Sequence, residues 1–173
     1  MKKLILISIL FYNYSFTQEY LEWKDRTVSP VVIEVNDLSA QEIYQRISSW
    51  VDDTYVSPKK VLMVDKSDKV RIRGISVHAF KTKGLGQTFW YNLQHTLTID
   101  IKEGKYRLTY EPEDILTSED VPVMWDLQYY YNKKGKLRMG AKEMPGSFNN
   151  YLKGLTISIN DAVSGLKKKD DDW

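Results

Sequence analysis

Residues Leu97 to Glu111 have the sequence LTIDIKEGKYRLTYE, which predicts two antiparallel strands joined at Glu103-Gly104. A two-residue turn there forms three pairs of apolar or aromatic residues on one face: Ile101 with Tyr106, Ile99 with Leu108, and Leu97 with Tyr110. The other face pairs Asp100 with Arg107 and Thr98 with Thr109, which suits a solvated face. A slip of one residue would mix the two faces, so the register is well determined. Glu-Gly is a weaker hairpin turn than Asn-Gly, which leaves the turn type open.

This hairpin predicts a sheet with one face in the core and one in water. Outward from it, the pattern predicts the order strand, helix, four strands, helix. The expected elements are strands at 31–35, 60–64, 70–79, 89–102 and 106–110, with helices from Ser39 to before Ser57-Pro58 and from about Ser147 to Leu166. We therefore expect an α+β fold in which about five antiparallel strands carry both helices on one face.

The start of the first helix has unusually complete signals. Ser39 is the expected N-cap, and Glu42 three residues later completes a capping box. Leu38 and Ile43 occupy the flanking positions of a hydrophobic staple. The last helix is predicted from an apolar stripe at helical spacing: Phe148, Leu152, Leu155, Ile159, Ala162 and Leu166.

Two irregularities are predicted between the helices. The apolar phase switches after Gly74 to Ile75, Val77 and Ala79, which is typical of a β-bulge at the glycine. Residues 81–87 contain Gly84 and Gly86 and are expected to form a loop.

The N-terminus predicts an exported protein. Lys2-Lys3 precede an apolar run from Leu4 to Tyr12, and the small residues Ser15 and Thr17 follow, so residues 1–17 are interpreted as a signal peptide. An uncleaved anchor is the alternative. Cleavage before Gln18 would leave a soluble periplasmic or secreted chain with no transmembrane segment.

Charge and cysteine content exclude some classes of partner and of metal site. The first 17 residues hold two of the 25 basic residues and none of the 23 acidic ones, so the remaining chain is neutral. Nucleic-acid binding is not expected of a chain without excess positive charge. The chain also has no cysteine, which excludes disulfides and thiolate metal sites.

One domain is expected at residues 31–166, with a linker at 18–30 before it and a charged tail at 167–173 after it. Residues 112–146 form an irregular insertion with three prolines and the Tyr129-Tyr130-Tyr131 run. A connection this long is often a lid or a binding loop. The sequence leaves open whether it is a mobile lid or a packed element.

Three stretches resemble a family of exported bacterial proteins, the domain of unknown function number 4468 with a TATA-binding-protein-like fold. They are LSAQEIYQRISSWVDDTY, VLMVDKSDKVRIRG and LTIDIKEGKYRLTY. The resemblance covers Val31 to Tyr110 well and the last helix loosely. It implies a curved sheet backed by helices and an exported location, and it implies no activity.

No catalytic motif is present: there is no nucleophile elbow, no zinc-protease motif and no phosphate loop. His95 has the phase of a core residue and is expected to be a satisfied core histidine. His78 has the opposite phase, so the two histidines are not expected to share a metal. We therefore expect no catalytic residue, metal or cofactor.

The helix-free sheet face is the predicted binding surface. On it, Trp90 offers a flat aromatic beside the amides of Asn92 and Gln94, a combination that stacks on and hydrogen-bonds to a sugar or peptide. The predicted ligand-binding residues are Trp90, Asn92, Gln94, Arg71, Arg73, His78 and Arg107. This favours a non-enzymatic binding module of the cell envelope, whose partner is a glycan, a peptide or an envelope protein. The alternatives are a hydrolase with carboxylate chemistry under residues 112–146, and a structural subunit.

Overall fold

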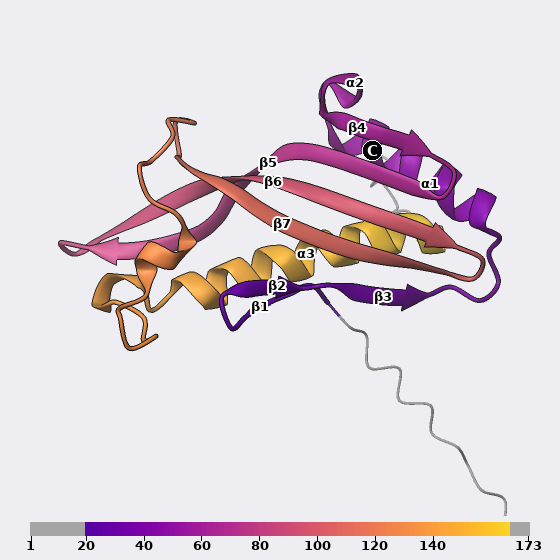
Figure 1. Cartoon of the computed structure of the whole chain (residues 1–173). Helices are drawn as coiled ribbons and strands as arrows, with labels where there is room; N and C mark the ends of the chain where they lie inside the picture. The colour runs from indigo at the N-terminus through magenta and orange to yellow at the C-terminus, as the bar shows by residue number, and fades with distance from the viewer. Residues whose placement is uncertain (1–19, 167–173) are drawn as a thin grey trace, which may run out of the picture.

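A computed structural model describes residues 20–166 of the chain (Figure 1). Its strands are β1 (Glu22–Lys24), β2 (Thr27–Ser29), β3 (Val31–Glu34), β4 (Leu62–Lys66), β5 (Lys69–Gly84), β6 (Gln87–Lys102) and β7 (Lys105–Thr117). Its α-helices are α1 (Ala40–Thr54), α2 (Pro58–Val61) and α3 (Met144–Ser164), and the 3-10 helices η1 (Leu127–Tyr130) and η2 (Met139–Ala141) precede α3. None of the helices within residues 20–166 is both long and apolar enough to span a bilayer.

The main sheet is antiparallel and has the order β3-β7-β6-β5-β4. The register predicted from the sequence is confirmed, because Ile99 lies opposite Leu108 and Asp100 lies opposite Arg107. Gly104 turns the hairpin with φ of 68°, a conformation that favours glycine. The predicted α+β fold of about five strands is confirmed.

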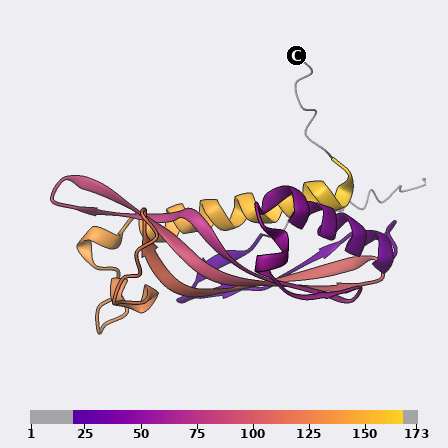
Figure 2. The same cartoon turned by 90° about the horizontal axis from the view of Figure 1, so that it is seen from above.

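Both long helices cover one face of the sheet (Figure 2). The capping box of α1 is present: the side chain of Ser39 accepts from the backbone N–H of Glu42, and the carboxylate of Glu42 accepts from the backbone N–H of Ser39. Helix α3 begins three residues earlier than predicted. Its buried stripe is Met144, Phe148, Leu152, Thr156, Ile159 and Val163, so the predicted Leu166 is instead exposed.

Residues 20–30 are more ordered than a linker. Strands β1 and β2 form a separate hairpin, and it is held against α3 by Trp23, whose backbone N–H donates to Asn149 Oδ1 at 2.6 Å. The Trp23 ring is buried beside Phe148, and its Nε1 donates to the Tyr131 hydroxyl at 3.0 Å. The predicted signal peptide and charged tail lie outside the described residues.

The two longest strands continue past the rest of the sheet as a two-stranded arm, residues 77–90 (Figures 1 and 2). The loop predicted at 81–87 is wrong, because pairing of β5 with β6 continues to Gly84 and Gln87. Only Leu85 and Gly86 form the turn. Gly84 and Gly86 are typical of a loop. The residues before them, Phe80, Lys81, Thr82 and Lys83, alternate in polarity or burial as in a strand.

The predicted bulge is not at Gly74 but between Ser76 and Phe80. The pairing register shifts there, and His78 has φ of 51°. As a result Ser76 and Phe80 are buried, whereas the predicted core residues Ile75 and Val77 are exposed. The predicted faces are wrong for Ile75 and Val77, because the buried Ser76 continues the core-facing phase of Val70 and Ile72, whereas Ala79 is buried as predicted.

Candidate functional site

The seven predicted ligand-binding residues separate into two groups. Arg71, Arg73 and Arg107 lie at the centre of the helix-free face, where the sheet is widest. His78 and Trp90 lie on the arm, and Asn92 and Gln94 lie between the two regions on β6. The predicted site is therefore not one continuous surface.

The centre of the helix-free face is a ladder of ion pairs. Asp100 accepts from Arg107 at 2.6 Å and lies 3.1 Å from Lys69 Nζ. The remaining pairs are Arg73 with Glu113 at 2.7 Å and Arg71 with Glu111 at 3.6 Å. The hydrogen bond from Arg107, together with Lys69, lowers the pKa of the Asp100 carboxyl. Each of the three predicted arginines is thus already paired with a carboxylate of β6 or β7.

Asn92 is only 2% exposed and is a structural residue. Its Oδ1 accepts from the backbone N–H of His78 at 2.8 Å, and its Nδ2 donates to Asp120 at 2.7 Å. The amide therefore holds the bulge of β5 to the turn that follows β7. The prediction that Asn92 contacts ligand is not supported by this burial.

Trp90 lines a pocket of about 560 Å³ between the arm and the N-terminal end of α3. The indole is 41% exposed, and its centroid lies 5.5 Å from both the His78 ring and Lys81 Nζ. The opposite wall is formed by residues of α3 and its start: Glu143, Gly146, Ser147, Asn150 and Tyr151. The pocket combines an aromatic surface with a cation, a carboxylate and an amide.

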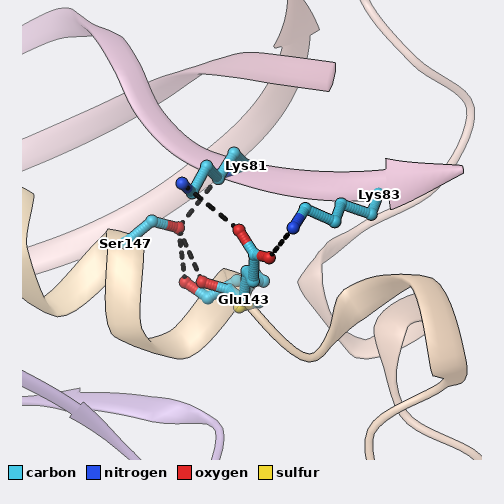
Figure 3. Close-up of polar contacts among 5 residues, drawn as sticks. Lys81, Lys83, Glu143 and Ser147 are labelled. Atoms are coloured by element: carbon cyan, nitrogen blue, oxygen red, sulfur yellow. Dashed lines mark hydrogen bonds and ion pairs between the residues drawn. The ribbon is translucent and has the colours of Figure 1, made fainter. Parts of the chain in front are cut away.

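Glu143 joins the arm to α3 (Figure 3). Its carboxylate lies 3.2 Å from Lys81 Nζ and 2.5 Å from Lys83 Nζ, and these two hydrogen bonds lower its pKa. Ser147 adds a contact to the strand, because its Oγ accepts from the backbone N–H of Lys81 at 3.0 Å. The two lysines and one glutamate leave this wall with an excess of positive charge.

Most of residues 112–146 lie away from Trp90, although Glu143 of this segment lines its pocket. β7 runs on to Thr117, and the remainder packs on the opposite face, where the buried Tyr130 meets the rings of Phe80 and Tyr91. Trp90 follows Tyr91 in a strand and so points the other way. The predicted cover is therefore wrong for the tyrosine run, whereas Glu143 and Asp120 of the same segment reach the Trp90 pocket and Asn92.

The sequence missed the wall that α3 contributes. The sequence predicts a loop at Lys81 and an irregular insertion at Glu143, so it indicates neither residue as part of the site. The available signal was the spacing of Lys81 and Lys83, which places both side chains on one face of a strand. No pattern in the sequence indicates that this face meets the start of α3.

His95 forms a buried polar cluster away from the pocket. Its Nδ1 lies 3.0 Å from Ser76 Oγ, and its ring stacks on Tyr110 with centroids 4.7 Å apart. Burial lowers the pKa of His95 to about 4. His95 and Ser76 are each 1% exposed, so this serine–histidine pair is closed to any substrate. The core position of His95 is confirmed, although its Nε2 has no partner within the described residues.

Residues 31–112 match the family model described as a domain of unknown function, DUF4468, with a TBP-like fold. This part of the chain is therefore similar to the DUF4468 family. A DUF4468 family protein from Bacteroides ovatus has a crystal structure with a TM-score of 0.61 at 14% identity, over 87% of this chain and 92% of that one. A TBP-like protein from Parabacteroides distasonis has a TM-score of 0.56 at 13% identity, over 82% and 95% of the two chains.

At these identities the two solved structures show a shared fold alone. No curated protein matches the chain. The family match therefore brings no activity, ligand or site residue with it. What the Trp90 pocket does has to be argued from its own chemistry.

Proposed function

We propose that this protein is an exported, non-enzymatic binding module of the cell envelope, and that the Trp90 pocket binds a saccharide. The observation that carries the proposal is the half-exposed indole of Trp90 inside a pocket. A large aromatic that remains open to water beside fixed polar groups is typical of a ligand site. Gln94 is half-buried farther along the same face of β6 and is not among the residues that line this pocket.

The chemistry of the pocket fits a sugar ring. The apolar face of a sugar can lie on the indole, while its hydroxyls hydrogen-bond to polar groups at the rim. Asn150 supplies an exposed amide, Glu143 a carboxylate acceptor and Lys81 an ammonium donor. Because Lys81 and Glu143 are already paired at 3.2 Å, their positions are fixed before a ligand arrives, which reduces the entropy lost on binding.

The hydrolase alternative has less support. Carboxylate catalysis requires one acid whose pKa is raised. Among residues 20–166, every carboxyl with a resolved pKa shift is shifted downward: Glu42, Asp100, Glu113 and Glu143. No group of three or more metal-ligating side chains occurs in the same part of the chain. Paired, ionised carboxylates suit recognition better than acid catalysis.

Export is part of the proposal and rests on residues 1–17. The basic start, the apolar run and the small residues before Gln18 support a cleaved signal peptide. Mass spectrometry of the protein from its native host should find an N-terminus within a few residues of Gln18. An intact Met1 in the cytoplasmic fraction would refute export.

A glycan array tests the ligand class. The full chain from Gln18 should bind a subset of glycans, and Trp90→Ala should lose that signal by about tenfold or more, because the stacking surface is removed. Phe89→Ala is the matched control, since Phe89 is 43% exposed but points to the other face of the arm. Phe89→Ala should retain binding. If no glycan binds, or both variants lose binding equally, the Trp90 pocket is not a saccharide site.

A further inference from the structure

The second candidate surface is the free edge of β6 at Gln87 to Trp90. β7 ends at Thr117, which pairs with Tyr91, so the four residues of β6 before Tyr91 have a neighbour only on the β5 side. Figures 1 and 2 show this end of the arm projecting beyond the other described elements. The space beside it lies in line with β7.

The hydrogen-bond pattern shows which backbone groups are free. The backbone N–H of Lys81 donates to Ser147, so it points away from β6. In an antiparallel pair, when the backbone groups of one residue point away from the partner strand, those of the residue opposite also point away. The backbone N–H and C=O of Trp90, which lies opposite Lys81, therefore point to the open side. The same holds two residues along, for Lys83 and Thr88. Thr88 and Trp90 therefore offer two donors and two acceptors to an incoming strand.

This edge lacks the protection that the edges at β4, β5 and the end of β7 have. β4 is short and carries Asp65 and Lys66, and the arm side of β5 is covered by Ser147 and by Gly140 of η2. The end of β7 is closed where the Val123 N–H donates to Ile115 O. By contrast Gln87-Thr88-Phe89-Trp90 contains no charge and no proline, the usual devices that prevent strand addition.

We propose that residues 87–90 are a strand-addition site for an extended, uncharged segment of another polypeptide. Backbone hydrogen bonds to Thr88 and Trp90 would hold it, and an apolar side chain beside Phe89 would give selectivity. The slot is about 14 Å long. That length is too small for the roughly 800 Å² per partner of a stable dimer, which favours a peptide segment over a second copy of this chain.

The inference does not depend on the proposed saccharide site. Strand addition uses the backbone of Trp90, whereas the pocket uses its indole together with Lys81 and Asn150. Asn150→Ala, which removes a pocket amide from α3, should leave peptide binding unchanged. The two proposals can therefore fail separately.

The probe is a phage-displayed library of random linear heptapeptides, selected on the full chain from Gln18. Peptides selected on the wild type should bind Thr88→Pro about tenfold more weakly, because proline removes an outward N–H and obstructs the added strand while leaving the β5 ladder intact. Thr88→Ala keeps the N–H and is the matched control, with binding within about twofold of wild type. Thermal unfolding confirms that both variants fold.

A second experiment uses wild-type protein and so avoids any folding defect. N-methylation of alternate residues in a selected peptide should abolish binding in one phase and spare it in the other, since only alternate N–H groups face β6. Equal loss in Thr88→Ala and Thr88→Pro, or indifference to N-methylation, would overturn the proposal. Failure to select any peptide would also overturn the proposal. A concentration-dependent dimer that Thr88→Pro dissociates would overturn it as well, because the edge would then bind a second copy of the chain.

Discussion

The centre of the helix-free face and the arm are made from the same two strands, yet they present opposite surfaces. At the centre, β5 and β6 have neighbours on both sides, and the carboxylates of Asp100, Glu111 and Glu113 pair with basic residues across the strands. On the arm the sheet is two strands wide, so one edge is open and Trp90 remains half-exposed.

The difference shows that the width of the sheet decides which residues are available to bind. Wherever a third or fourth strand is present, it supplies partners for the polar face of its neighbours. Where the neighbouring strands end, the arm is met instead by η1, by η2 and by the start of α3, which reaches it through Glu143 and Ser147. Binding surfaces are therefore expected on the narrow end of the sheet.

The largest expected effect is Ile99→Ala, which removes a fully buried side chain under the centre. It should lower the free energy of unfolding by about 2–5 kcal/mol, because it leaves a cavity in the core. Trp90→Ala should lower it by about 1 kcal/mol, because much of that ring is already in water. Urea denaturation measures both, and comparable losses would mean that the arm is a second core.

The hairpin of β6 and β7 was predictable because both of its faces are sorted strictly by polarity, so only one register satisfies Ile99, Leu108, Asp100 and Arg107 together. The same sorting predicted the helices and the fold. It failed where polarity and burial disagree. Ser76 is polar but buried by hydrogen bonds to His95 and Tyr110, and this reversed the predicted faces of the neighbouring residues.

The candidate site was only half predictable, for a related reason. The strand phase correctly placed Trp90 opposite the core. The partner wall is more than fifty residues away in the sequence and is set by how α3 crosses the twisted arm. Local patterns carry no information on such a contact, so Glu143, Ser147 and Asn150 were missed.

The next largest effect is the pH dependence of stability that the buried His95 causes. It distinguishes the core from the exposed arm. Its pKa of about 4 lies below the ordinary value of 6.5, so the unfolded chain takes up a proton first as the pH falls. Stability should therefore decrease by about 2–3 kcal/mol between pH 7 and pH 4.5. The Glu113 carboxylate and the Tyr110 hydroxyl face the ring. The pKa of Glu113 is lowered and that of Tyr110 is raised, so in the folded chain Glu113 stays mainly ionised and Tyr110 stays neutral over this pH range.

Urea unfolding at several pH values tests this. His95→Gln should flatten the dependence between pH 6.5 and 4.5, whereas His78→Gln, at an exposed position on the arm, should keep the wild-type slope. A His95→Gln protein with an unchanged slope would show that the buried ring is not the source.

Gly140→Ala tests how the arm is braced. A Cβ at Gly140 would collide with the carbonyl oxygen of Lys83, so η2 would have to move away from β5. We expect a loss of about 1–3 kcal/mol and faster amide exchange in residues 80–84. The matched control is Gly154→Ala in α3, where a Cβ meets open space and should stabilise by about 0.5–1 kcal/mol. Unchanged exchange in the arm would mean that η2 does not support it.

The smallest effect is expected where the most ion pairs lie. Asp100 accepts from both Lys69 and Arg107, but these two cations are about half exposed, so solvent screens the attraction. Asp100→Asn should therefore lower the free energy of unfolding at pH 7 by about 1 kcal/mol or less. Because the pKa of Asp100 is lowered in the folded chain, its contribution is present above the unfolded value of 3.8 and is lost as the pH falls further. The difference between Asp100→Asn and wild type should vanish in strong acid, and a double-mutant cycle with Arg107→Met should give a coupling below about 1 kcal/mol. A coupling several times larger would mean that the central ladder, rather than only the core beneath it, stabilises the wide part of the sheet.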